Sequence, residues 1–266
     1  GAIGVWCQKL GEAEAMADGG VDNILITYEI IGTAKILRLM NLAKRVNLMV
    51  TVDDPDNVAD LSQAAQAAGV DLGILVDVNS GQNRCGIDPG SPAVALAQSV
   101  AKSPGLVLNG LCGYEGHLQS VADLEERTTR AREAMSRVTA TAEAIRKDGI
   151  DVEIVSAGGT GTYNITGDYP GVTEVQAGSY VLMDASYRKV LHDFDLAGTQ
   201  QGDGTDENRH GARTGNAEQQ GRDQAAALFR IVRAFRPDNA AHFAFAEVRF
   251  VLRRLNRVPI GDPVND

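Results

Sequence analysis

The chain has 266 residues, of which 44% are hydrophobic, and its formal net charge is −10. This size favours one large domain with a buried core, and the acidic balance, without a basic or aromatic cluster, argues against nucleic-acid binding. No apolar run is long enough to span a membrane, and no signal-peptide pattern opens the chain. Three widely spaced cysteines fit neither a disulfide framework nor a zinc motif, so we expect a cytoplasmic protein.

Short apolar segments alternate with longer helical segments along the first two thirds of the chain. Apolar residues at Ile36, Leu39, Met40 and Ala43 are spaced for one face of a helix. A second helix begins at Pro55, with Asp53 or Asp54 as its N-cap. The pattern predicts helices at 11–17, 33–45, 55–68, 92–102 and 123–148, and strands at 3–8, 23–27, 48–52, 73–78, 106–111, 152–155 and 173–176.

This alternation, without hairpin signals, predicts a parallel sheet whose strands are buried. Seven strand–helix units favour an α/β fold, a (β/α)8 TIM-type barrel with one unit missing. A doubly wound open sheet is the alternative, because it has the same local pattern. Barrel active sites lie at the carboxyl ends of the strands. Polar side chains occupy these places at 8–9, 27–29, 53–54, 77–84, 114–117, 156–163 and 176–180.

The most distinctive segment is VSAGGTGTY at 155–163, where an apolar strand gives way to glycines and threonines. Glycines allow sharp turns and close approach of a ligand, and successive backbone N–H groups form an anion site. An ordinary glycine-rich turn is the competing interpretation. A second glycine turn follows at Gly178. If the first barrel unit is the missing one, both turns follow strands 7 and 8, where barrels often bind phosphate.

Three other side chains are candidates for chemistry at the strand ends. Arg84 is placed to hold an anionic oxygen, although a solvated arginine is the commoner case. Tyr114 is suited to stacking on a flat ligand. His117 is a candidate acid, base or ligand, with a structural role as the more frequent alternative.

The composition changes after Leu196. Residues 198–223 contain no large apolar residue, which favours a disordered linker, and residues 198–266 together contain ten Arg and no Lys. We therefore expect a partial barrel domain at 1–197, a linker at 198–224 and an Arg-rich tail at 225–266, in which two amphipathic helices broken at Pro237 are one interpretation. The chain begins with Gly1, which predicts that it starts inside a longer protein or after processing.

Five segments carry a resemblance to a known family: GVWCQK at 4–9 with EAE at 12–14, VDVNSGQNRCG at 76–86, GYEGHLQ at 113–119, VSAGGTGTY at 155–163 and VQAGSYVLMD at 175–184. The chain resembles the barrel domain of the fold-type III pyridoxal-phosphate enzymes, the group of the alanine racemase N-terminal domain. Within that group it is most similar to the D-threonine aldolase and D-serine dehydratase family. The resemblance covers residues 1 to about 196.

The resemblance implies that pyridoxal 5'-phosphate is the cofactor. It places Gly159, Thr160, Gly178 and Ser179 at the cofactor phosphate. Arg84 would lie near the 3-hydroxyl oxygen, and Tyr114 would lie against the pyridine ring.

Gln176 occupies the position from which an alanine racemase directs an arginine to the ring nitrogen. A neutral amide there would favour a protonated ring, which is the stronger electron sink and suits cleavage or elimination.

Two features of the family are missing. The lysine that binds the cofactor lies on the first barrel strand of the family, upstream of Gly1, and Lys9 matches a different motif lysine. The family's C-terminal domain holds a divalent metal, Mn, Mg or Zn, whose ligands are not found here; His210 and His242 receive no such role. We therefore expect the chain alone to be inactive or nearly so.

The resemblance implies a lyase acting on a small D-amino acid. D-threonine cleavage to glycine and acetaldehyde is favoured over D-serine elimination to pyruvate and ammonia. The alternatives are an amino-acid racemase of the same superfamily, a non-catalytic pyridoxal-phosphate-binding protein and an inactive fragment. The resemblance implies a monomer or a homodimer.

Overall fold

The computed structural model describes residues 2–179, 187, 190 and 249–253. Strands and helices alternate along the chain, as the hydrophobic pattern predicts. The elements are β1 (Ala2–Cys7), α1 (Leu10–Asp18), β2 (Asn23–Ile26), α2 (Thr33–Ala43), β3 (Asn47–Val52), α3 (Pro55–Ala68), β4 (Leu72–Asp77), α4 (Ser91–Lys102), β5 (Leu106–Gly113), the 3-10 helix η1 (Gly116–Leu118), α5 (Leu124–Lys147), β6 (Ile154–Ala157), α6 (Tyr163–Thr166), β7 (Glu174–Val175) and β8 (Arg249–Arg253).

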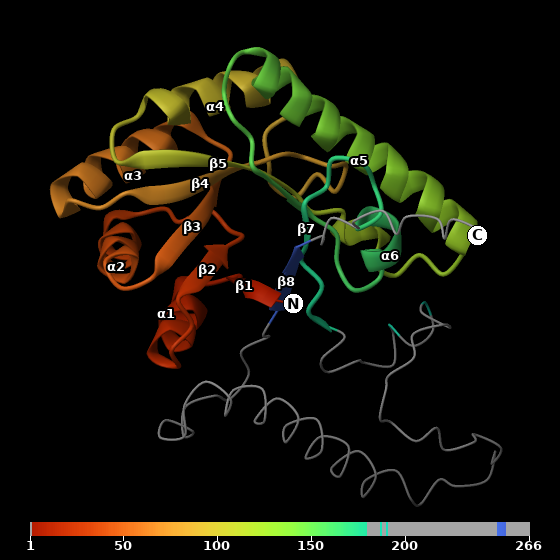
Figure 1. Ribbon diagram of the computed structural model, residues 1–266, viewed down its shortest axis with the longest axis horizontal. Coiled ribbons are helices and arrows are strands. Elements are labelled where there is room, and N and C mark those ends of the chain that lie inside the picture. The colour runs from red at the N-terminus through yellow and green to blue at the C-terminus, as the bar shows by residue number, and fades with distance from the viewer. Residues whose placement is uncertain (1, 180–186, 188–189, 191–248, 254–266) are drawn as a thin grey trace, which may run out of the picture.

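Strands β1 to β7 pair in chain order and are all parallel. The sheet curls, and the helices lie along its outer face (Figure 1). The expected partial (β/α)8 barrel is therefore confirmed, and the closed strand order excludes the open doubly wound sheet. All carboxyl ends of the parallel strands face the same side, which is where the candidate site residues lie.

The core has two layers because alternate side chains of a strand point to opposite faces. Ile24 and Ile26 of β2 belong to the larger cluster, which includes buried residues of the outer helices such as Leu39 and Leu61. Leu25 belongs to a smaller cluster with Trp6, Leu75 and Cys112. The strands are buried on both faces, which explains their continuous apolar sequence.

The helix caps that the sequence predicts for α3 are present. Asp54, rather than Asp53, is the N-cap of α3, and its Oδ1 accepts hydrogen bonds from the backbone N–H groups of Asp56 and Asn57. Gly69 ends the same helix in the left-handed conformation, with φ +65°. Asp53 is left for another contact, described below.

Strand β8 closes the barrel between β1 and β7 and is antiparallel to both. Its residues lie in the segment for which an amphipathic helix was one interpretation, and that interpretation is wrong for residues 249–253. Without β8, the edges of β1 and β7 would leave backbone groups unpaired, and a strand of β-favouring residues such as Phe250 and Val251 pairs with them. The expected linker at 198–224 and the remainder of the 225–266 tail lie outside the described residues.

Strand β6 begins and ends two residues later than the sequence predicts. Ser156 and Ala157 pair with Cys112 and Gly113 of β5, so the glycine-rich turn begins at Gly158. Within the part of the chain that is described, no helix combines the length and apolar character needed to cross a membrane.

Candidate functional site

A pocket opens at the carboxyl ends of the barrel strands. Its walls come from β1, β4 and β5 and from the segments that follow β1, β2, β4, β5 and β7. It encloses about 310 Å3 of empty space, open solvent included. The residues lining it are Trp6, Gln8, Thr27, Tyr28, Asp77, Arg84, Cys112, Tyr114 and Gln176.

Arg84 lies over two aromatic rings in this pocket. Its guanidinium carbon is 4.9 Å from the centre of the Tyr28 ring and 5.8 Å from the centre of the Tyr114 ring. Both distances are within the range of a cation–π interaction. The two tyrosines follow different strands, so the contact joins the β2 and β5 ends of the site.

The loop carrying Arg84 is held by hydrogen bonds from its backbone N–H groups to side-chain oxygens. Oδ1 of Asn79 accepts from the N–H groups of Gly81 and Asn83, and Asn83 takes the left-handed conformation with φ +54°. The N–H of Gly86 donates to Oδ2 of Asp53 at 2.9 Å, which fixes the other end of the loop to the β3 end. These bonds hold the loop backbone on both sides of Arg84.

Gln176 follows β7 and is buried. Its Nε2 donates to Oγ of Ser156 at 2.8 Å and to Sγ of Cys112 at 3.3 Å. With both amide hydrogens used in this way, Oε1 is the polar atom with which Gln176 can accept a hydrogen bond from a ligand.

The two glycine turns follow neighbouring strands, β6 and β7. A side chain added at Gly158 would contact Val175 of β7 at 3.2 Å, so the turns lie side by side. Gly159, Thr160 and Gly178 are buried, and Ser179 is half-buried. These four residues lie beside the pocket rather than in its wall.

The glycine loop at 158–162 is bound from behind by the segment that follows β5. Glu115 accepts hydrogen bonds from the N–H of Gly158 and from the hydroxyl of Thr162, and Gln119 accepts from the N–H of Gly161. The sequence analysis did not predict these contacts of Glu115 and Gln119, because no local motif indicates which loop their side chains bind. The available signals were that both residues lie in the matched segment 113–119 and that Glu115 belongs to the polar stretch 114–117 at a strand end.

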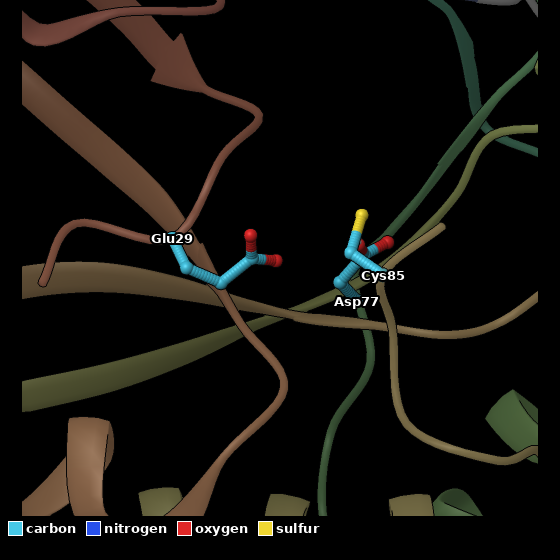
Figure 2. Close-up of side chains that lie close together, drawn as sticks. All are labelled: Glu29, Asp77 and Cys85. Carbon is cyan, nitrogen blue, oxygen red and sulfur yellow. The ribbon is translucent and has the colours of Figure 1, made fainter. Parts of the chain in front are cut away.

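Two carboxyl groups and a thiol lie close together (Figure 2), and one of them, Asp77, lines the pocket. Ligand atoms of Glu29, Asp77 and Cys85 all lie within 4.8 Å of one another, and Sγ of Cys85 donates to Oδ2 of Asp77 at 3.3 Å. Burial, reinforced by the charge of Glu29, raises the pKa of Asp77 to about 7. Burial also raises the pKa of Glu29, and burial with the charge of Asp77 raises that of Cys85 to about 11.

The raised pKa values mean that this cluster of three side chains holds protons near neutral pH. The same atoms are close enough to bind one divalent ion once their protons are lost. The sequence predicts Glu29 and Asp77 at strand ends. It does not predict that Cys85 lies beside them, because that depends on the fold of the long loop after β4.

Two other residues named by the sequence lie elsewhere. His117 is in η1 and does not line the pocket; burial lowers its pKa, and the charge of Arg130 adds to this effect. Lys9 is exposed at the N-cap of α1. Of the lysines within residues 2–179, none lines the pocket.

The parallel barrel has its pocket and two adjacent glycine turns at the carboxyl ends of the strands, the side where TIM-type barrels carry their active sites. A family model described as "Alanine racemase, N-terminal domain" matches residues 1–186. The chain belongs to this family, which confirms the resemblance found in its motifs.

Relatives with curated names include lyases. The chain is 39% identical over 204 residues to 3-hydroxy-D-aspartate aldolase of Paracoccus denitrificans strain Pd 1222, covering 76% of this chain and 52% of the relative. It is 37% identical over 197 residues to D-threonine aldolase of an Arthrobacter species, covering 74% and 52%. The crystal structure of D-threonine aldolase from Filomicrobium marinum superposes with a TM-score of 0.69 at 45% identity, covering 71% and 51%. The chain spans about half the length of these proteins.

Proposed function

We propose that the whole protein is a pyridoxal-phosphate-dependent lyase that cleaves a D-3-hydroxy amino acid, with D-threonine as the favoured substrate. The observation that carries this proposal is the meeting of Arg84, Tyr114 and Gln176 around one pocket at the barrel end. The family membership and the aldolase relatives support the reaction class. Glycine and acetaldehyde would be the products of D-threonine.

The pocket suits the cofactor that the family implies. Tyr114 offers an aromatic face for a planar ring, and Arg84 offers donors for an anionic ring oxygen. Gln176 offers a neutral acceptor, Oε1, for a protonated ring nitrogen. Gly159, Thr160, Gly178 and Ser179, in the two adjacent turns, remain the proposed phosphate-binding residues.

When bound, the cofactor takes up the electrons released as a bond to the substrate α-carbon breaks. Gln176 would keep the ring nitrogen protonated, because a neutral amide does not repel that positive charge as a racemase arginine does. Asp77, with a pKa of about 7, can hold or release a proton at the pocket wall near neutral pH. The proposal thus favours bond cleavage over racemisation.

The lysine that attaches the cofactor is not assigned to a described residue. A divalent metal, Mn, Mg or Zn, remains part of the proposal for the whole protein. Among the described residues, Glu29, Asp77 and Cys85 form a group whose atoms lie close enough together to hold a metal ion. No step of the proposed reaction depends on them as ligands.

An assay of the whole protein with pyridoxal 5'-phosphate tests the proposal. D-threonine, L-threonine, D-serine and D-alanine would be supplied separately, and acetaldehyde, pyruvate and L-alanine measured. Acetaldehyde from D-threonine alone is the expected result. Pyruvate from D-serine would identify a dehydratase, and L-alanine a racemase.

Borohydride reduction followed by peptide mass analysis locates the attachment lysine in the same preparation. Cofactor binding without any product would indicate a non-catalytic binding protein and would contradict the lyase proposal. Gln176→Arg provides an internal comparison, because the proposal expects it to shift the product ratio towards racemisation.

A further inference from the structure

Glu115 is a carboxylate with no exposed surface, although it lies in a loop. Its Oε1 accepts hydrogen bonds from the hydroxyls of Thr162 and Thr166, both at 2.6 Å, and its Oε2 accepts from the N–H of Gly158 at 3.0 Å. Among the described residues, no ion pair involves Glu115. Burying a carboxylate without a cation is costly, so these three hydrogen bonds are what compensate it.

Gln119, one turn further along, completes the same support. Its Oε1 accepts from the N–H of Gly161 at 2.7 Å, and its Nε2 donates to the hydroxyl oxygen of Thr162 at 3.0 Å. That oxygen also accepts from the N–H of Gly159 at 3.2 Å. The Thr162 hydroxyl therefore accepts two hydrogen bonds and donates one, to Glu115.

Gln119 packs so closely against the glycine loop that no side chain fits at Gly159 or Gly161. A Cβ atom at Gly159 would lie 2.5 Å from Oε1 of Gln119 and 3.0 Å from the Tyr114 ring. A Cβ atom at Gly161 would lie 2.2 Å from the backbone oxygen of Gln119. The loop is thus in contact with both Gln119 and a residue of the pocket wall.

We propose that Glu115 and Gln119 are positioning residues that hold the 158–162 loop in the conformation that receives the cofactor phosphate. This inference rests on the proposed function. The N–H groups of Gly158, Gly159 and Gly161 donate inside this support, and the glycines also allow the loop to pack closely against it.

The direction in which Glu115→Gln changes phosphate affinity distinguishes a positioning role from a simple effect of charge. A buried negative charge behind an anion site repels phosphate, so removing it without other consequences would tighten phosphate binding. Glu115→Gln removes the charge but also replaces one of the accepting oxygens with a donor. If positioning dominates, the substitution weakens phosphate binding instead.

The experiment titrates the 266-residue chain with pyridoxine 5'-phosphate and with pyridoxine. Both lack the aldehyde that would attach to surface lysines, and they differ by the phosphate. In Glu115→Gln we expect about tenfold weaker binding of pyridoxine 5'-phosphate, with pyridoxine changed less than about twofold. Amide exchange at Gly158 should quicken by about tenfold as well, which reports the loop without any ligand.

Thr166→Val is the milder variant in case Glu115→Gln does not fold, because it removes one hydroxyl from Glu115 and keeps the side-chain shape. Its matched control is Thr141→Val, which removes a buried hydroxyl that accepts from the N–H of Gly90, far along α5. Thr166→Val should weaken pyridoxine 5'-phosphate binding selectively, and Thr141→Val should not.

Unchanged or tighter pyridoxine 5'-phosphate binding in Glu115→Gln would overturn the inference. So would unchanged exchange at Gly158, or equal losses in Thr166→Val and Thr141→Val. If the unsubstituted chain binds the two ligands equally, the phosphate site of the proposed function is what fails.

Discussion

Arg84 lies over the ring of Tyr28, with 4.9 Å between the guanidinium carbon and the ring centre. The two residues come from loops after β4 and β2, and they share a pocket with Asp77. The ring supplies an apolar, electron-rich face that keeps the guanidinium in place without neutralising it. Arg84 therefore keeps its full charge for an anionic ligand.

Replacing Tyr28 with Leu should weaken binding of pyridoxine 5'-phosphate about threefold, because a cation–π contact at a partly exposed site contributes roughly 0.5–1 kcal/mol. Tyr28→Phe keeps the aromatic face and should bind almost normally. Isothermal titration calorimetry measures both. Equal losses in the two variants would show that the Tyr28 hydroxyl, and not its ring, matters.

The Asp77 carboxyl group should make stability depend on pH. Its pKa is about 7 in the folded protein and 3.8 in its ordinary state, so the folded chain holds a proton that the unfolded chain has released between these values. Stability should fall as pH rises from about 4 to about 7 and then level off. The full difference of about 3 pKa units corresponds to roughly 4 kcal/mol.

Urea unfolding of the chain and of Asp77→Asn, measured at pH 5 and pH 8, checks this prediction. Asparagine carries no titrating proton, so the stability lost on going from pH 5 to pH 8 should be smaller in this variant. Asp60→Asn, an exposed substitution on α3, is the control and should behave like the unsubstituted chain. An equal pH slope in all three proteins would show that Asp77 does not titrate in this range.

Hydrophobic periodicity was enough to predict the barrel. Buried positions at Ile36, Leu39 and Met40 fall where the helical spacing puts them, and the strand order follows from strict alternation. The predicted boundaries differ by one or two residues in most elements. Strand β8 was missed because its pairing depends on the open edges of β1 and β7, which are far away in sequence.

The sequence was enough to predict which residues lie at the site, but not which side chains contact one another there. Strand ends identify Arg84, Tyr114 and Gln176 as neighbours, because parallel strands bring their carboxyl ends together. Their assigned roles at the cofactor stay predictions. The Tyr28 ring and the support from Glu115 depend on side-chain directions that loops set through tertiary hydrogen bonds, which local sequence does not encode.

The N-cap of α3 gives a test of local stability. Asp54→Ala removes the acceptor for the N–H groups of Asp56 and Asn57 and should cost about 1 kcal/mol of unfolding free energy. Asp54→Asn keeps an acceptor oxygen and should cost less. Asp60→Ala on the exposed side of the same helix should be nearly neutral, and a comparable loss there would mean that helix charge rather than capping is responsible.

Gly110 of β5 pairs with Ile154 of β6 and leaves no space for a side chain. The register of β5 against β4 shifts here, so that Leu108 pairs with Ile74 and Gly110 pairs with Leu75. A Cβ atom at Gly110 would lie 1.8 Å from the backbone oxygen of Ile154. Because that neighbour is backbone within a paired strand, it cannot move aside as a flexible side chain would.

Gly110→Ala should therefore lower the unfolding free energy by about 3 kcal/mol or more, at the upper end of the usual cost of overpacking. Gly11→Ala is the matched control, because Gly11 lies in α1 with no atom within 4 Å of its added Cβ. Alanine favours a helix over glycine, so Gly11→Ala should stabilise the chain by roughly 0.5–1 kcal/mol. Urea unfolding at one pH compares them, and a Gly110→Ala chain as stable as the parent would show that β5 and β6 separate at this point.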